Sequence, residues 1–178
     1  MLTPGGPAPI DAEESQRSRA LAERIRGRIQ ANGGWLPFST FMQAALYEPE
    51  LGYYVSGAAI FGAAGDFVTA PELSPLFAGC LARAVDGLLQ DATDDVLEFG
   101  AGSGRLAAEL VAALARVGRA PRRYRIVEPS PVLRERQRRL LERMPREATA
   151  FEWLDAPPPE GWSGVAIANE VLDALPVD

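Results

Sequence analysis

The stretch Val96-Leu97-Glu98-Phe99-Gly100-Ala101-Gly102-Ser103-Gly104-Arg105-Leu106 decides the fold of this chain. Its first four residues are mostly apolar and are typical of a short buried strand. The three glycines indicate a tight turn, and residues 106–111 begin a helix at once. Glycines let the backbone approach a bound group closely, and a helix start offers unpaired N–H groups and a positive dipole end. The stretch therefore predicts a binding site for a nucleotide-like ligand.

The spacing of the glycines narrows the class of ligand. A dinucleotide-binding turn reads G-x-G-x-x-G/A, and its third glycine allows close packing of helix and strand. Here the third glycine comes one residue early, and Arg105 stands in the place it should occupy. The pattern is E-x-G-x-G-x-G, which resembles motif I of the class I S-adenosylmethionine-dependent methyltransferases, where the loop wraps the methionine part of the cofactor. It predicts cofactor contacts at Glu98, Gly100, Gly102 and Gly104. On the turn alone, a Rossmann-like turn for another ligand stays open.

Strand and helix patterns alternate after this loop. We expect a helix to about residue 117, a strand at 124–128, a charged amphipathic helix at 131–144, and strands at 149–154 and 164–168. This alternation implies an α/β fold with a parallel sheet and right-handed crossovers. The arginines at 134–139 are interpreted as the solvated face of their helix.

Two acids follow the second and third predicted strands. Glu128 ends the second strand, where a carboxylate can hydrogen-bond both hydroxyls of an adenosine ribose. Asp155 follows the third strand, where an acid can accept a hydrogen bond from an adenine amino group. For Glu128 the alternative is an exposed acid at a strand end without a ligand.

The first part of the chain is predicted to be helical. Residues 1–10 are expected to form a disordered tail. The spacing of Leu21, Ile25 and Ile29 predicts an amphipathic helix over 11–32, which the glycines at 33–34 end. A second short helix is expected to begin at Ser39 as N-cap and to end at Pro49. A long loop then leads to residue 74.

A third helix is predicted to begin at Ser74-Pro75. Its expected buried stripe consists of Leu76, Phe77, Cys80, Leu81, Ala84 and Leu88. Cys80 is the only cysteine, and its place on this stripe favours a core residue over a nucleophile. A single cysteine also excludes an internal disulfide and a cysteine-based metal cluster within the chain.

Composition limits the remaining function classes. The 178 residues carry a net charge of −6, which argues against nucleic-acid binding. The chain contains no lysine and no histidine, so a histidine base, a Ser-His triad and a Schiff-base lysine are excluded within it. No apolar run is long enough for a transmembrane helix, and no metal is called for. The Pro/Gly-rich, acidic start lacks the pattern of a secretory signal or transit peptide, which favours a bacterial cytoplasmic protein.

Two further motifs make the resemblance more specific. One is Gly65-Asp66-Phe67-x-Thr69-x-Pro71-Glu72-x-Ser74, and the other is Asn169-Glu170-x-x-Asp173-Ala174-Leu175-Pro176-Val177. Together with residues 51–54 (LGYY) and the glycine loop, they resemble the MidA-like family of bacterial and mitochondrial proteins. The eukaryotic member of this family is a protein-arginine methyltransferase that assists respiratory complex I assembly. The resemblance covers residue 38 to the end of the chain.

This resemblance implies a Rossmann-like class I methyltransferase fold, S-adenosylmethionine as methyl donor and, by extension, symmetric dimethylation of an arginine on a partner protein. The partner would be a respiratory complex I subunit, and a mitochondrial location follows only by family analogy. A homodimer is compatible with the resemblance. Asp66, Thr69 and Pro71 are expected to bind the cofactor, and Asp66 and Glu72 are candidates either for covering it or for helping to bind the acceptor.

Carboxylates near the end of the fourth strand are the candidates for catalysis. A guanidinium acceptor would be held by bidentate hydrogen bonds to carboxylates. We therefore predict Glu170 and Asp173 as catalytic residues, with Asn169 orienting them. Their alternative is a turn and a helix cap at a strand end.

The chain departs from the family in two respects. The family often has Pro and Arg where this chain has Ala101 and Ser103. The chain also ends directly after the fourth-strand motif, whereas a complete sheet of this class has seven strands. We therefore expect an N-terminal fragment, with a helical region and cofactor-covering loop at 11–74 and the first half of the methyltransferase domain at 75–178. Two other function classes stay open: a non-catalytic assembly protein that keeps the fold, and a dinucleotide-dependent oxidoreductase.

Overall fold

The computed structural model describes residues 12–56, 68–89, 95–144 and 149–177. The chain divides into two compact units. The first comprises residues 1–56 with 176–178, and the second comprises residues 57–175. Of the helices in the described ranges, none combines the length and the apolar character needed to cross a membrane.

The first unit contains two helices, α1 (Ala12–Ala31) and α2 (Phe38–Tyr47). The predicted helix over 11–32 is confirmed, and Gly33 and Gly34 end it with φ values of 74° and 97°, which L-residues rarely adopt. The predicted N-cap at Ser39 is wrong. The first helical hydrogen bond runs from the N–H of Phe41 to the carbonyl of Pro37, so Ser39 lies inside the helix.

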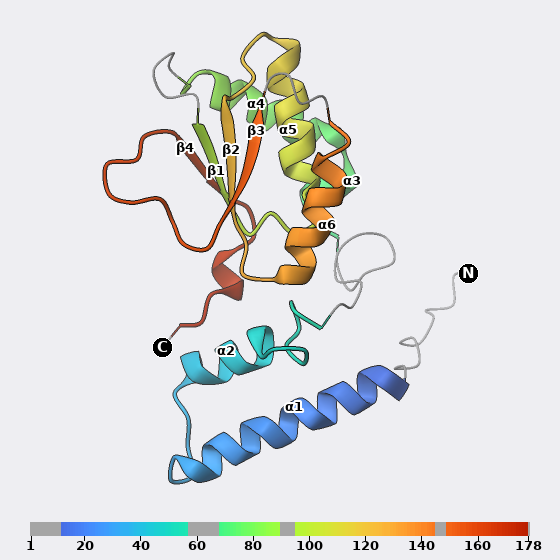
Figure 1. The fold of residues 1–178 in the computed structure, drawn as a ribbon, viewed down its shortest axis with the longest axis vertical. Coiled ribbons are helices and arrows are strands. Elements are labelled where there is room, and N and C mark those ends of the chain that lie inside the picture. Colours follow the sequence, from blue (N-terminus) through green and yellow to red (C-terminus); the bar gives the residue numbers. More distant parts are fainter. Residues whose placement is uncertain (1–11, 57–67, 90–94, 145–148, 178) are drawn as a thin grey trace, which may run out of the picture. The chain divides into compact units, whose positions relative to one another are not determined.

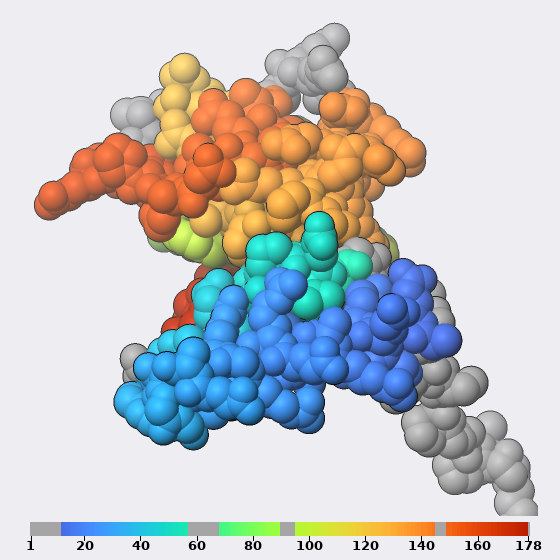
Figure 2. Space-filling view, turned by 60° about the horizontal axis from the view of Figure 1, so that its bottom comes forward, coloured from blue at the N-terminus to red at the C-terminus, as the bar shows by residue number. Residues whose placement is uncertain are grey.

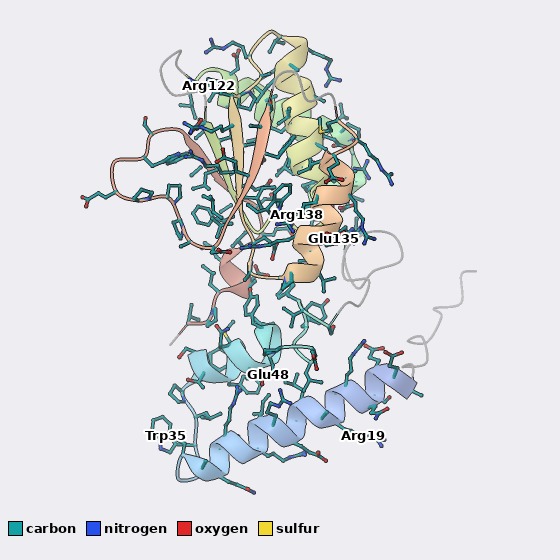
Figure 3. The ribbon with its side chains drawn as sticks, in the orientation of Figure 1. Arg19, Trp35, Glu48, Arg122, Glu135 and Arg138 are labelled. Carbon is teal, nitrogen blue, oxygen red and sulfur yellow. The ribbon has the colours of Figure 1, made fainter. Side chains whose placement is uncertain are left out.

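Glu48 joins the two helices of the first unit (Figure 3). Its carboxylate accepts a hydrogen bond from Nη1 of Arg24 at 2.9 Å and lies 2.8 Å from Nη2 of Arg28. The hydrogen bond from Arg24 is the largest cause that lowers the pKa of Glu48 below its usual value. This pair of arginines from α1 thus holds the end of α2.

The second unit is a four-stranded parallel sheet with helices (Figure 1). Its elements are α3 (Ala70–Leu73), α4 (Pro75–Asp86), β1 (Asp95–Phe99), α5 (Arg105–Arg116), β2 (Arg123–Val127), α6 (Pro131–Leu141), β3 (Ala150–Leu154), β4 (Val165–Ala168) and a 3₁₀ turn η1 (Leu172–Ala174). The strand order is β3-β2-β1-β4, and each neighbouring pair is parallel. The predicted α/β class and Rossmann-like sheet are confirmed.

All the long helices of this unit lie on one face of the sheet (Figure 1). The chain moves from β1 to β2 to β3 in one direction, and right-handed crossovers through α5 and α6 then place both helices on the same side. The connection from β3 to β4 returns past two strands without a helix, and it loops outward from the sheet (Figure 2). The order therefore reverses between β1 and β4, which is where open α/β sheets bind ligands.

The core lies between that face and the helices. Its fully buried side chains include Leu110 and Leu114 of α5 and Tyr124 and Ile126 of β2. The register pairs Val96 with Tyr124 and Glu98 with Ile126, so the apolar face of the sheet includes one carboxylate. That carboxylate belongs to the glycine-loop motif.

The predicted buried stripe of α4 is partly wrong. Cys80 and Ala84 are exposed, and Leu76 and Leu88 are 77% and 64% exposed, whereas Phe77 and Leu81 pack against the core as predicted. The buried residues are Ala78, Ala82, Val85 and Leu89. Alanines at 78 and 82 let α4 approach α5 closely, and the face of the helix that is buried differs from the predicted one. The predicted cap is confirmed, because Oγ of Ser74 accepts the N–H of Leu76 at 3.2 Å.

Candidate cofactor site

The candidate residues gather at the carboxyl edge of the sheet. The glycine loop follows β1, Glu128 follows β2, Asp155 follows β3, and Asn169 follows β4. In a parallel sheet these ends share one edge, so residues far apart in sequence become neighbours. The register confirms that Phe99, Val127, Leu154 and Ala168 end adjacent strands in the same layer.

The glycine loop requires its glycines. Gly100, Gly102 and Gly104 have φ values of 60°, 52° and 84°, a region that L-side chains rarely adopt. The loop is held at its start by a hydrogen bond from the N–H of Gly100 to the carbonyl of Val127 at 2.9 Å. The turn then leads directly into α5, for which Gly104 is the N-cap. The predicted strand–turn–helix arrangement is confirmed.

Gly104 is more restricted than Gly100. A Cβ there would lie 3.2 Å from Cγ and 3.3 Å from Cα of Gln137 on α6. The third glycine therefore sets the distance between the loop and α6. The helix in this close contact, α6, follows the second strand, β2.

We expect Gly104→Ala to weaken S-adenosylhomocysteine binding at least tenfold and to destabilise the fold by about 1–3 kcal/mol, because the left-handed backbone and the contact with Gln137 both oppose a methyl group. Gly79→Ala is the matched control. Gly79 lies inside α4 with open space around its Cβ position, so this change should stabilise the helix by about 0.5–1 kcal/mol. Equal stability changes in the two variants, measured by urea unfolding, would contradict the assignment.

Glu98 lies in the core rather than on the surface. It is 2% exposed, and its Oε2 accepts a hydrogen bond from the hydroxyl of Tyr124 at 2.8 Å. Its pKa is raised to about 7: burial is the largest cause, the hydrogen bond from Tyr124 opposes the rise, and the nearby charge of Glu128 adds to it. Burial likewise raises the pKa of Tyr124 well above its usual value. Glu98 is thus a carboxyl group poised to change charge near neutral pH.

The raised pKa of Glu98 predicts a pH-dependent stability. The folded state binds more protons than the unfolded state between about pH 4.5 and 7, so the free energy of unfolding should fall as pH rises through this window. Glu98→Gln keeps an acceptor for Tyr124 and removes the charge. We expect it to be more stable than the wild type by up to about 3 kcal/mol at pH 8 and to differ little at pH 4.5. Urea unfolding at both pH values tests this, and parallel pH profiles would contradict it.

Glu128 is buried and already hydrogen-bonded. It is 3% exposed, its Oε1 accepts the N–H of Ser130 at 3.0 Å, and its Oε2 accepts from Nε2 of Gln137 at 3.2 Å. Burial is the largest cause that raises its pKa, and the bond from Ser130 opposes this. Each carboxylate oxygen has a further lone pair. Glu128 is therefore oriented by the protein and retains capacity for two hydroxyl donors.

Asp155 is 93% exposed at its side chain and pairs with Nη1 of Arg134 at 2.8 Å. Arg134 also donates to the backbone carbonyls of Glu128 and Leu154. The prediction that residues 134–139 form a solvated face is therefore wrong for Arg134, which joins the ends of β2 and β3. It is also wrong for Arg138, whose guanidinium lies 5.0 Å from the ring centroid of Trp153 (Figure 3). Carbonyls at strand ends need donors, and long arginine side chains supply them.

The short helix α3 lies against the glycine loop. Oγ of Ser103 donates to Glu72, and Nη1 of Arg105 donates to the carbonyl of Glu72 at 3.2 Å. Thr69 is the N-cap of α3, and Pro71 is buried within it. The segment predicted as loop is therefore helical at 70–73, and Glu72 brings it to the loop. The predicted cofactor residue Asp66 lies outside the described residues.

The Asn-Glu motif follows β4. Nδ2 of Asn169 donates to Oε1 of Glu170 at 3.4 Å, and Asp173 lies in η1. Glu170 has a φ of 53°, which is uncommon for a residue other than glycine. A side chain of Val171 lies 3.2 Å from the Cβ position of Gly100, so this segment contacts the first glycine of the loop.

Sequence reasoning missed Gln137 as a residue of the site. It is fully buried on α6, between Leu133 and Leu141 at helical spacing. A lone polar residue on an otherwise apolar helix face was the available signal. A buried amide at such a place requires partners, which the sequence does not reveal.

The arrangement suits an adenosine-containing cofactor without a pyrophosphate. The loop offers close backbone approach, and Glu128 offers acceptors for ribose hydroxyls. Glu98 and Glu128 are buried, and in their ionised form they would favour a cationic sulfonium. The residues present therefore fit S-adenosylmethionine.

Comparisons with known proteins agree with this fit. Residues 80–178 match the family model Methyltransf_28, described as "Putative S-adenosyl-L-methionine-dependent methyltransferase". A COG1565 superfamily protein from Burkholderia thailandensis, solved with S-adenosyl-homocysteine bound, is 48% identical with a TM-score of 0.84, covering 97% of this chain and 46% of that one. A second COG1565 structure from Burkholderia thailandensis is 46% identical with a TM-score of 0.78, covering 97% of this chain and 44% of that one.

Curated relatives carry a more specific name. The Drosophila melanogaster "Protein arginine methyltransferase NDUFAF7 homolog, mitochondrial" is 27% identical over 182 residues, covering 89% of this chain and 41% of the relative. The homologue of the same name from Caenorhabditis elegans is 26% identical over 186 residues, covering 91% and 43%. The chain thus spans less than half the length of the relatives it matches. The matched family uses the cofactor that the sequence led us to expect, S-adenosylmethionine. The chain belongs to the MidA-like (COG1565) family of S-adenosylmethionine-dependent methyltransferases.

Proposed function

We propose that the protein transfers a methyl group from S-adenosylmethionine to an arginine on a partner protein. The observation that carries this proposal is the positive φ of Glu170 at the end of β4, next to Val171, whose side chain reaches the Cβ position of Gly100. Non-glycine residues with positive φ cost free energy and concentrate at functional sites. A carboxylate held there is suited to a cationic acceptor next to the cofactor.

The reaction needs alignment more than acid–base power. When bound, S-adenosylmethionine supplies a methyl group on a sulfonium; the S–CH₃ bond breaks as the N–CH₃ bond forms. Glu170 and Asp173 would hold the guanidinium through charge-assisted hydrogen bonds, with Asn169 orienting Glu170. The carboxylate of Glu170 would accept the proton that the methylated nitrogen releases. The absence of histidine and lysine from the chain is compatible with this scheme.

Cofactor binding is assigned to the edge of the sheet. The three glycines would approach the methionine part, Glu128 would bind the ribose hydroxyls, and Asp155 would accept from the adenine amino group. Glu98 would contribute to the cofactor site from beneath the glycine loop, and Asp66, Thr69 and Pro71 would cover the cofactor. In this proposal residues 75–178 form the first half of the methyltransferase domain, and residues 11–74 form the helical region and covering loop.

We propose arginine as the acceptor from the names of the relatives, and the partner from the family resemblance. Proteins named arginine methyltransferase NDUFAF7 in three animals match this chain, and their names place them in mitochondria. These names support a protein substrate for this chain. From the family resemblance we propose a respiratory complex I subunit as the partner. We propose a bacterial cytoplasm as the location of the protein.

A binding and transfer experiment tests the proposal. S-adenosylhomocysteine and NADH are titrated separately into the intact protein by calorimetry, and binding of the first alone is expected. Methyl transfer is then followed by mass spectrometry of arginine-containing partner proteins incubated with labelled S-adenosylmethionine. NADH binding without S-adenosylhomocysteine binding would favour an oxidoreductase. Cofactor binding with no methylated arginine would leave the cofactor assignment in place and remove the arginine acceptor.

A further inference from the structure

Gln137 occupies a central position behind the cofactor edge. It lies on α6 and is completely buried, yet its amide has partners on three other segments. Nε2 donates to the carbonyl of Gly102 at 3.0 Å and to Oε2 of Glu128 at 3.2 Å. Oε1 accepts from Nε1 of Trp153 on β3 at 2.8 Å. One side chain thus connects the glycine loop, the end of β2 and β3.

The chemistry of these partners orients the amide. An indole N–H only donates, so the amide oxygen must face Trp153. The two amide hydrogens then face two acceptors, the carbonyl of Gly102 and the carboxylate of Glu128. Both hydrogens of the amide nitrogen are therefore used. Neither a carboxylate nor an apolar side chain of the same length could satisfy this pattern.

Packing reinforces the hydrogen bonds. The backbone and side chain of Gln137 lie 3.2–3.4 Å from the Cβ position of Gly104. Gly102 and Gly104 are thus both in contact with the same residue of α6. The position of the glycine loop relative to Glu128 depends on this residue from two directions.

We propose that Gln137 is a positioning residue that sets the glycine loop and the carboxylate of Glu128 at the separation that the cofactor requires. The inference rests on the proposed ribose-binding role of Glu128. Ser130 and Gln137 each engage one oxygen of that carboxylate, so the loss of Gln137 leaves one oxygen without its protein donor. Cofactor affinity then depends on an amide at position 137, although this residue need not touch the cofactor.

Two substitutions and one control test this role. Gln137→Met keeps the length and removes the amide, and S-adenosylhomocysteine should bind the intact protein about 10- to 100-fold more weakly. Arg136→Met on the exposed side of the same helix is the matched control and should bind as the wild type does. Calorimetry gives both affinities, and circular dichroism shows whether the variants fold.

Gln137→Glu adds a readout that a purely structural role would not produce. The new carboxylate would face the carboxylate of Glu128. Two other charged groups lie near Glu128: Glu98 on β1, whose pKa its charge raises, and Arg134 of α6, which donates to its backbone carbonyl. Two carboxylates at hydrogen-bond distance hold a shared proton at lower pH. The affinity loss should therefore be large at pH 8 and several-fold smaller at pH 6, while the wild type changes less.

The outcomes separate the two proposals. Wild-type affinity in both Gln137 variants, or a Gln137→Glu loss that does not depend on pH, would overturn the positioning role. If Gln137→Met fails to fold, the pH profile of Gln137→Glu decides the question, and failure of both variants to fold counts against a role confined to cofactor positioning. Failure of the wild-type protein to bind S-adenosylhomocysteine would instead overturn the cofactor assignment itself.

Discussion

Glu128→Ala is expected to weaken S-adenosylhomocysteine binding to the intact protein by about 10²- to 10⁴-fold. Two hydroxyl donors on one carboxylate contribute about 1.5–3 kcal/mol each, and alanine removes both acceptors. Burial raises the pKa of this carboxyl, so its ionised form is costly to keep in the folded protein. Removing it should therefore lower affinity much more than stability. Calorimetric titration measures the first quantity and urea unfolding the second.

Glu135→Ala is the matched control for Glu128→Ala. Glu135 is an exposed acid on α6, paired with Arg139 at 2.8 Å across one helical turn (Figure 3). Exposed pairs of this kind contribute little, so affinity should stay within about twofold of the wild type. Unchanged affinity in Glu128→Ala would remove the ribose assignment. Equal losses in both variants would indicate a general electrostatic effect of acidic residues.

Glu170→Gln is expected to lower the rate of methyl transfer by about 10²- to 10⁴-fold with cofactor affinity retained. The amide keeps the shape of the side chain, but it loses the charge that holds a guanidinium and the ability to accept its proton. Because this effect concerns the acceptor, the dissociation constant of S-adenosylhomocysteine should change little. Labelled methyl transfer to a partner protein and calorimetry together separate these two quantities.

Glu160→Gln controls for the loss of one negative charge near the sheet. Glu160 is an exposed acid in the connection between β3 and β4, outside the predicted site. Wild-type turnover is expected in this variant. Wild-type turnover in Glu170→Gln as well would remove Glu170 from the catalytic candidates. If biological function persisted in Glu170→Gln without methyl transfer, a non-catalytic assembly role would be favoured.

Much of the fold follows from local patterns. The glycine loop, the alternation of strands and helices, and the acid after β2 are all local signals, and the structure places them as predicted at one edge of a parallel sheet. The cap at Ser74 was readable for the same reason, since a serine followed by proline specifies a helix start by short-range bonding. Ser39 misled because Pro37 provides an alternative entry to the same helix.

The burial of individual side chains was harder to predict from the sequence. Periodicity shows that α4 has an apolar face, but its alanines and its leucines both satisfy helical spacing. Cys80 was assigned to the buried face because periodicity alone does not show which face of α4 packs on α5. Arg134 was assigned to solvent because helical periodicity does not show that its guanidinium reaches the carbonyl of Leu154, 20 residues away at the end of β3.

By itself, the sequence determined the class of fold and the residues that follow each strand, because turn chemistry and periodicity act over a few residues. The cofactor family followed from the resemblance of its motifs to a known family. Only the tertiary structure decided how those residues are held. Glu98 lies under Tyr124, Glu72 contacts Ser103, and Gln137 joins three segments. The contacts of Glu98 with Tyr124, of Glu72 with Ser103 and of Gln137 with Gly102 span 26 to 35 residues of chain, a distance over which no local pattern carries information. A buried polar group finds its partner only when the whole sheet and its helices are in place.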